Sequence, residues 1–243
     1  MSKWTELNSA MRDFFKNYKL LPIVGGIFLL TAAGCDLDNN DPAPLPPVAY
    51  VSLYQASPNS PDLNIILDDK VIANGFEYTD HTGYLRFVTG NRTLEFGPSG
   101  ADNVVLDTTM KFEEGRAYSI FVVDEYQKAD VLILDDDTET PTAGKAKVRF
   151  LNLSPDAAEV NLAEADSADA MFTGQAFKEG SAFMEVDARK YNFVIKSASG
   201  DDVILSLPNA ILLDGFSYTV LVRGYQTPPG GSQSVLSAEL VVD

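Results

Sequence analysis

The stretch VSLYQASP at residues 51–58 recurs 97 residues later as VRFLNLSP at residues 148–155. Farther along the chain, GRAYSIFV at 115–122 corresponds to GFSYTVLV at 215–222, with an offset of 100. The offset changes by only a few residues, which is what loop insertions between shared strands produce. The sequence therefore predicts two copies of one domain.

Each copy has the sequence pattern of β structure. Runs such as NRTLEF at 91–96 and YNFVI at 191–195 are short, rich in β-branched and aromatic residues, and bounded by turn-forming residues. Along the opening strands, alternate apolar positions predict the core face: Val51, Leu53, Val148 and Phe150. We expect an all-β protein with two tandem immunoglobulin-like antiparallel β-sandwiches.

Two motifs recur at matched positions and indicate structural roles. Gly-x-x-Tyr pairs Gly115 with Tyr118 and Gly215 with Tyr218. A tight turn at glycine before a strand-opening tyrosine suggests the tyrosine corner of immunoglobulin-like sandwiches, in which the hydroxyl bonds to an upstream backbone group; an apolar role for the rings is the alternative. The second motif is the Ser-Pro that follows each opening strand: Ser57, Pro58, Ser154 and Pro155.

The N-terminal segment has the pattern of a targeting signal. Residues 1–19 carry four basic side chains, and residues 20–34 form an uncharged run of 15 positions, shorter than the ~20 residues of a membrane-spanning helix. The run ends in TAAGC at 31–35, which resembles the lipobox of bacterial lipoproteins, although Ala32 stands where that family usually has leucine. We expect a signal peptide at 1–34 and lipidation of Cys35; a free cysteine after a transmembrane anchor is the alternative.

Behind Cys35, acidic residues and then prolines predict an extended tether over residues 35–47. In one large Gram-negative group, such acidic residues resemble a signal for export to the outer face of the outer membrane. The expected location is therefore the cell outer membrane, lipid-anchored and surface-exposed. The expected domains are a first repeat at 48–135, a linker at 136–144 and a second repeat at 145–243.

The paired Ser-Pro strands, the Gly-x-x-Tyr strands and the lipobox together resemble a bacterial family of domains of unknown function. Its members are secreted or lipid-anchored proteins with tandem immunoglobulin-like sandwiches. The second copy matches better, because Asp156 and Ala157 follow its Ser-Pro, whereas Asn59 and Ser60 stand in the first copy. The resemblance implies fold and location, and it carries over no catalytic residues.

Composition excludes several classes of function. The chain has 35 acidic and 18 basic residues, a net charge of −17, one His and one Cys. So acidic a chain repels nucleic acid, and one Cys and one His cannot build a His-rich metal cage or an internal disulfide. We expect no catalytic residues, no metal and no cofactor. Four carboxylates within residues 135–139 leave Ca²⁺ binding at the linker as an alternative to a solvated joint.

One face of the first opening strand is a candidate for binding. Tyr50 and Tyr54 lie on the side opposite Val51 and Leu53 and could stack on sugars or anchor a protein partner. Alternatively these rings cover an outer sheet edge or meet the second domain. Thr108 and Ser167 lie in tripeptides that resemble an O-glycosylation motif of the same Gram-negative group.

The expected function is a non-catalytic binding or adhesion module that is attached to the membrane through a lipid and that recognises a protein or glycan. A structural spacer or assembly subunit of a surface complex is the first alternative. A small surface hydrolase is the second.

Overall fold

The computed structural model describes residues 45–243 except 102 and 201, and residues 46–243 form one compact unit. Its regular structure consists of strands apart from one short 3-10 turn, η1 (Tyr126–Lys128), so the expected all-β fold is confirmed. The predicted signal peptide, Cys35 and most of the tether lie outside the described residues. None of the helical structure in this part of the chain is long and apolar enough to cross a membrane.

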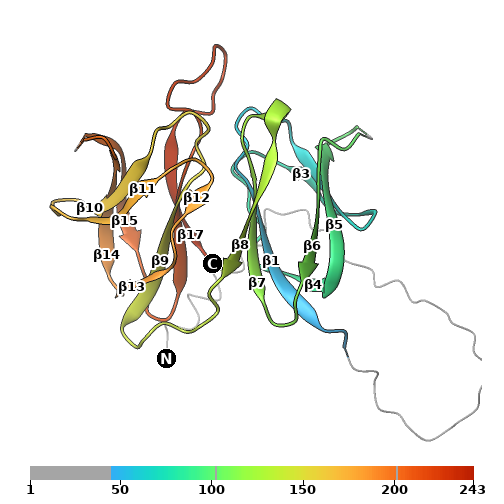
Figure 1. Cartoon of the computed structure of the whole chain (residues 1–243), viewed down its shortest axis with the longest axis horizontal. Helices are drawn as coiled ribbons and strands as arrows, with labels where there is room; N and C mark the ends of the chain where they lie inside the picture. Colours follow the sequence, from blue (N-terminus) through green and yellow to red (C-terminus); the bar gives the residue numbers. More distant parts are fainter. Residues whose placement is uncertain (1–44, 102, 201) are drawn as a thin grey trace, which may run out of the picture. The chain divides into compact units, whose positions relative to one another are not determined.

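The first repeat is a sandwich of two four-stranded sheets with the orders β4-β1-β7-β8 and β3-β2-β5-β6 (Figure 1). Its strands are β1 (Val48–Gln55), β2 (Leu63–Leu67), β3 (Lys70–Phe76), β4 (Leu85–Val88), β5 (Gly90–Pro98), β6 (Leu106–Phe112), β7 (Ala117–Val123) and β8 (Asp130–Asp136). All pairings are antiparallel except that of β1 with β7, which is parallel.

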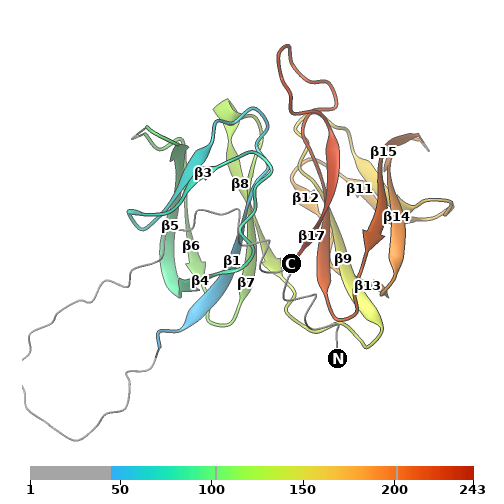
Figure 2. The same ribbon diagram turned by 180° about the vertical axis from the view of Figure 1, so that it is seen from behind.

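The second repeat has the same strand order, with β13-β9-β16-β17 and β11-β10-β14-β15, and a short β12 that also pairs with β9 (Figure 2). Its strands are β9 (Lys145–Asn152), β10 (Val160–Glu164), β11 (Ala170–Gln175), β12 (Glu179–Gly180), β13 (Met184–Asp187), β14 (Lys190–Ser197), β15 (Val203–Ile211), β16 (Ser217–Arg223) and β17 (Ser237–Val242). β9 pairs with β16 in parallel, as β1 does with β7.

Each sandwich has its own hydrophobic core, on the strand faces that the alternating apolar residues predict. Val51 and Leu53 are buried in the first core, and Val148 and Phe150 in the second. Because strand side chains alternate between faces, these positions fix which face of β1 and β9 points inward. The predicted core face is therefore confirmed in both copies.

The two predicted tyrosine corners are present. Gly115 and Gly215 have φ angles of +73° and +82°, a conformation that favours glycine. The Tyr118 hydroxyl accepts a hydrogen bond from the backbone N–H of Glu113 at 3.3 Å, and the Tyr218 hydroxyl accepts one from Leu213 at 2.9 Å. Each hydroxyl thus ties a strand to the turn five residues upstream.

Candidate functional site

The two tyrosines of the predicted binding face lie in different environments. Tyr50 is 40% exposed, but Tyr54 is only 4% exposed. The Tyr54 ring stacks on Phe121, with 4.4 Å between the ring centroids, and on His81, with 5.6 Å. The expectation of two open rings is therefore corrected, because Tyr54 is covered and cannot meet a ligand at the surface.

What covers Tyr54 is the second sandwich. The outer face of β1, β7 and β8 packs against the outer face of β9, β16 and β17 through a third hydrophobic cluster. Its buried members are Tyr54, Ala56, Phe121 and Val123 from the first repeat and Leu151, Leu153, Leu221 and Val241 from the second. For Tyr54, the structure therefore agrees with the alternative interpretation, in which the ring contacts the second domain.

A buried ion network accompanies that cluster. Toward the first repeat, Arg149 donates from Nη1 to Asp136 Oδ1 at 2.6 Å and from Nη2 to Ser119 Oγ at 2.9 Å. Toward the second repeat, it donates from Nη2 to Asp243 Oδ1 at 3.2 Å and from Nε to Thr219 Oγ1 at 2.7 Å. The side chains of Arg149, Asp136 and Asp243 are at most 3% exposed. One guanidinium therefore joins a carboxylate and a hydroxyl from each sandwich.

Burial and charge shift the pKa values in this network. Burial raises the pKa of Asp243 to about 6, in spite of the nearby Arg149. For Arg149, burial alone would lower the pKa, but the carboxylates of Asp243 and Asp136 outweigh it and raise the pKa. The network holds two carboxylates for one guanidinium, and the charge of the neighbouring Asp136 adds to the rise in the Asp243 pKa.

The linker is shorter than expected because β8 continues through Asp136. Two of its carboxylates already have cationic partners: Asp136 pairs with Arg149, and Asp137 with Lys147 at 2.6 Å. Across the described residues, no three His, Cys, Asp or Glu side chains are grouped so as to hold a metal.

The Ser-Pro turn of the second repeat holds a neighbouring loop in place. Ser154 Oγ donates to the carbonyl oxygen of Gly224 at 2.6 Å. Two residues on, the carboxylate of Asp156 accepts from the backbone N–H groups of Gln226 and Thr227, both at 2.7 Å. In the first repeat Ser57 is buried, and its hydroxyl has no hydrogen-bond partner within the described structure.

That loop is where the two repeats differ most. Six residues (124–129) connect β7 to β8, whereas thirteen (224–236) connect β16 to β17. The longer loop extends beyond the ends of the strands (Figure 1). Its base is tight: Gly224 has a φ of +83°, and a Cβ there would collide with the carbonyl oxygen of Val235. Asn59 of the first repeat also contacts it, accepting from Ser232 Oγ at 2.7 Å.

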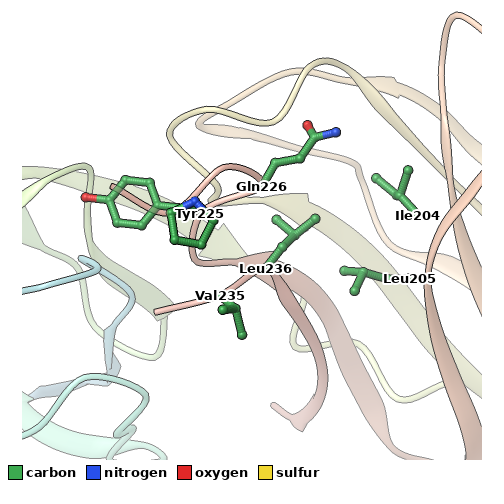
Figure 3. Close-up of a pocket in the computed structure, with 7 residues that line it drawn as sticks. Ile204, Leu205, Tyr225, Gln226, Val235 and Leu236 are labelled. Atoms are coloured by element: carbon green, nitrogen blue, oxygen red, sulfur yellow. The ribbon is translucent and has the colours of Figure 1, made fainter. Parts of the chain in front are cut away.

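An apolar groove of about 370 Å³ lies between this loop and β15. Ile204 and Leu205 of β15 face Val235 and Leu236 across it, and Gln226 lies above (Figure 3). The complete lining is Ile204, Leu205, Tyr225, Gln226, Pro228, Val235 and Leu236. The Tyr225 ring points away from the two β15 side chains (Figure 3) and is 4% exposed.

The lining determines what the groove can do. It contains no charged side chain, and β15 is the edge strand of its sheet, so one row of its backbone groups faces away from β14. Val235 is 59% exposed and Val203, at the start of β15, is 53% exposed. Exposed aliphatic side chains beside a strand edge suit an apolar ligand segment. We take this groove as the candidate functional site; none of the residues predicted from the sequence as site residues lines it.

The remaining predicted site residues lie apart from the groove. Thr108 is a partly exposed residue of β6, and Ser167 lies in the turn between β10 and β11, where its hydroxyl donates to the carbonyl oxygen of Asp169 at 3.0 Å. Their modification stays a prediction.

The fold and the groove define the class: a tandem β-sandwich protein with an apolar groove in its second repeat. Residues 49–163, which span the first sandwich and the first two strands of the second, match the model of a family described as "Domain of unknown function (DUF4397)". The resemblance to a domain-of-unknown-function family is thereby confirmed. No curated protein matches the chain.

Several solved structures are similar to the chain at low identity. The C-terminal domain of AlgF from P. aeruginosa is 22% identical over 41% of this chain and 99% of its own, with a TM-score of 0.32. A family CBM26 domain of Eubacterium rectale Amy13K, solved with maltoheptaose, is 10% identical over 78% and 96%, with a TM-score of 0.26. A streptococcal virulence factor described as binding α-glucan is 14% identical over 71% and 92%, with a TM-score of 0.24. At these TM-scores, functional arguments rest on the chain's own residues.

Proposed function

We propose that this chain is a lipid-anchored protein of the outer membrane, exposed at the cell surface, that binds a partner without catalysing a reaction. The anchor is Cys35, and the acidic and proline-rich segment behind it is the tether. The two sandwiches present the groove of the second repeat to the partner.

The observation that carries this proposal is the difference between the repeats. The β16–β17 loop, which is seven residues longer than its counterpart, supplies one wall of the groove. Asp156 and Asn59 hold that loop in place by hydrogen bonds, and Gly224 permits the tight approach at its base. A loop fixed in advance loses little conformational entropy when a ligand binds.

Of the two ligand classes, the lining favours a protein over a glycan. Sugar-binding sites present aromatic faces, on which apolar sugar faces stack. The groove presents aliphatic side chains, and its one aromatic ring, that of Tyr225, points away from Ile204 and Leu205 (Figure 3). The proposed ligand is therefore an uncharged, apolar segment of a protein.

Crosslinking on intact cells tests the groove. A photoreactive amino acid is placed at Gln226, which lines the groove, and for comparison at Val71, an exposed apolar position of β3 in the first repeat. We expect a discrete crosslinked partner from position 226 and none from position 71.

A matched pair of variants then tests the apolar contact. Val235→Asp places a charge in the groove, whereas Val71→Asp makes the same change at a similarly exposed site. Val235→Asp should abolish the crosslink from position 226, and Val71→Asp should leave it unchanged. Equal crosslinking in both variants would refute the groove as the binding site.

Membrane attachment is tested separately. Cys35→Ala removes the thiol that would receive the lipid, so the protein should move from the membrane fraction to the soluble fraction and lose incorporated fatty acid. Leu37→Ala, two residues along the tether, keeps the cysteine and should behave as the unchanged protein does. Equal fatty-acid labelling of the Cys35→Ala protein would contradict the anchor.

The second candidate function is that of a spacer or assembly subunit. It is favoured by the buried contact between the sandwiches, because Arg149 and the shared hydrophobic cluster join them into one unit. A spacer needs a fixed separation between its ends but no groove. A partner that still binds the Val235→Asp variant would favour this function.

A further inference from the structure

One end of the second repeat exposes apolar side chains where the first repeat exposes charged ones. The matched positions, with the first repeat given first, are Lys111 and Ile211, Glu113 and Leu213, Arg116 and Phe216, and Asp135 and Val242. The first three pairs share an offset of 100, and the last pair lies opposite the matched tyrosines Tyr118 and Tyr218. We name the four apolar residues the end patch.

In the first repeat, the matched charged side chains form two ion pairs at the surface. Lys111 Nζ lies 3.3 Å from Glu113 Oε1, and Arg116 Nη2 lies 3.1 Å from Asp135 Oδ2. All four of these side chains are at least half exposed, so they remain hydrated. The second repeat therefore uses the same positions of the fold with both ion pairs replaced by apolar side chains.

The end patch is exposed in the described structure. Ile211 is 59% exposed, Val242 52%, Leu213 45% and Phe216 41%. Three of the four adjoin Tyr218: its hydroxyl accepts from the N–H of Leu213, its ring centroid lies 6.5 Å from that of Phe216, and its backbone pairs with Val242. Isolated exposed apolar side chains are common, but four neighbouring ones at positions matched to charges indicate a surface that is covered when the protein functions.

The chain enters the first sandwich at the same end of the molecule. Gly115 and Gly215, in the matched turns, donate their N–H groups to the carbonyl oxygens of Val48 and Lys145, each at 2.9 Å. Each turn thus lies beside the start of its own repeat. The two turns also adjoin one pocket of about 200 Å³, which is lined by Ala117 of the first repeat and Gly215 of the second. The end patch and the entry of the chain therefore share one end.

The end patch lies near the tether and far from the groove. The predicted tether of residues 35–47 has thirteen residues and spans at most about 45 Å when fully extended. The groove lies at the opposite end of the second sandwich, because β15 runs from Val203, next to the groove residue Ile204, to Ile211 in the end patch. A surface that holds Cys35 and covers the end patch therefore leaves the groove facing away from it.

We propose that the end patch docks on the lipid surface that holds the anchor. The choice of a lipid surface rests on the anchor in the proposed function, because a short tether keeps this end of the molecule close to the bilayer. Three aliphatic side chains and one aromatic ring gain free energy on leaving water for the bilayer interface, whereas the ion pairs of the first repeat would lose their hydration there. Docking through one repeat fixes the orientation of the molecule and points the groove outward.

A tryptophan reporter in the end patch tests this contact. Residues 46–243 form one compact unit that contains both cores, and the chain's only tryptophan, Trp4, precedes them. Phe216→Trp and its matched control Arg116→Trp are attached, through a histidine tag before residue 46, to phosphatidylcholine vesicles that contain a nickel-chelating lipid. We expect the indole at position 216 to emit at shorter wavelength on the vesicles and to lose most of its emission when the acyl chains carry bromine, a contact quencher. The indole at position 116 should do neither.

Transferring an ion pair between the repeats tests which residues make the contact. Ile211→Lys combined with Leu213→Glu, in the Phe216→Trp protein, gives the second repeat the ion pair that Lys111 and Glu113 form in the first. Quenching should be abolished, while the melting temperature and the attachment through the tag stay unchanged. Equal quenching of both reporters, or quenching that survives the transferred ion pair, would overturn the proposal. So would an unquenched indole at position 216, which is also the result expected if a protein partner covers the end patch. The tag replaces Cys35 as the attachment, so this result is independent of the fatty-acid labelling that tests the anchor.

Discussion

At the scale of single residues, the inter-sandwich network places ionisable groups where water does not reach. Asp243 and Asp136 share one guanidinium, that of Arg149. The pKa of Asp243 rises to about 6 through burial, which means that the folded protein holds its proton more tightly than the unfolded chain does. Proton binding and folding are then linked.

The sign of this linkage gives a prediction. The Asp243 contribution to stability is fully present below about pH 3.8, its ordinary pKa, and is lost as pH rises through about 6. Asp243→Asn removes the titration. The unfolding free energy of the original chain should therefore fall relative to that of Asp243→Asn between pH 5 and 7.5, by about 1.4 kcal/mol.

Chemical denaturation of both proteins across this pH range measures the difference directly. Burial also lowers the pKa of His81, and this shift makes stability rise with pH in the same range. Both proteins contain His81, so its effect cancels when they are compared. A difference that does not change with pH would contradict the assignment.

Gly224 is the residue on which the long loop depends. Its φ of +83° and the nearby Val235 carbonyl oxygen both exclude a side chain. Gly224→Ala should lower stability by about 1–3 kcal/mol and increase amide hydrogen exchange in the loop. Gly230→Ala, in the same loop with nothing within 4 Å of the added Cβ, is the matched control and should have little effect on either measurement.

At the scale of elements, the tyrosine corners make unequal contributions. Tyr218→Phe breaks a hydrogen bond of 2.9 Å, and Tyr118→Phe breaks one of 3.3 Å. We expect Tyr218→Phe to cost about 1 kcal/mol and Tyr118→Phe less, because hydrogen bonds weaken with distance. Urea denaturation of both variants tests the order; a larger loss in Tyr118→Phe would be inconsistent with the geometry.

These elements also show what the sequence could predict. Alternation along β1 places Val51 and Leu53 in the core, and the repeat places the second core by correspondence. Alternation does not reveal what covers the opposite face of the strand. The residues alternate with a period of two whether that face is covered by another domain or by solvent. The apolar residues on the outer face of β9 and β16, such as Leu151 and Leu221, give a weak signal, since strands buried on both faces have nearly continuous apolar runs.

The groove was harder to predict. Seven additional residues between β16 and β17 are visible as a change of the repeat offset from 100 to 107. Composition identifies the insertion TPPGGSQ at 227–233 as a loop. It does not show that Asp156 fixes the loop beside β15, because that contact joins residues 70 positions apart.

At the scale of the whole molecule, the two repeats combine separate cores with a shared surface. Each core is complete within its own repeat, whereas the third cluster and the Arg149 network need both. The linker at 136–144 is mostly polar and acidic. The apolar contact is made by the strands on either side of it instead.

Separate expression of residues 48–136 and 145–243 tests this division. Each half should give a dispersed amide NMR spectrum, because each retains its core. Collapsed spectra from both halves would mean that neither core is sufficient without the shared surface.

The position of β1 determines how the molecule responds to mechanical load. The chain enters the first sandwich at Val48 and continues directly into β1, which lies between β4 and β7 and is hydrogen-bonded to both. A pull on the preceding segment, directed along the strand, loads both rows of hydrogen bonds, because β1 pairs with β4 over residues 48–51 and with β7 over residues 50–55. If residues 35–47 are the proposed tether, a load passed through them acts on β1 in shear, and the tether should extend fully before the first strand yields.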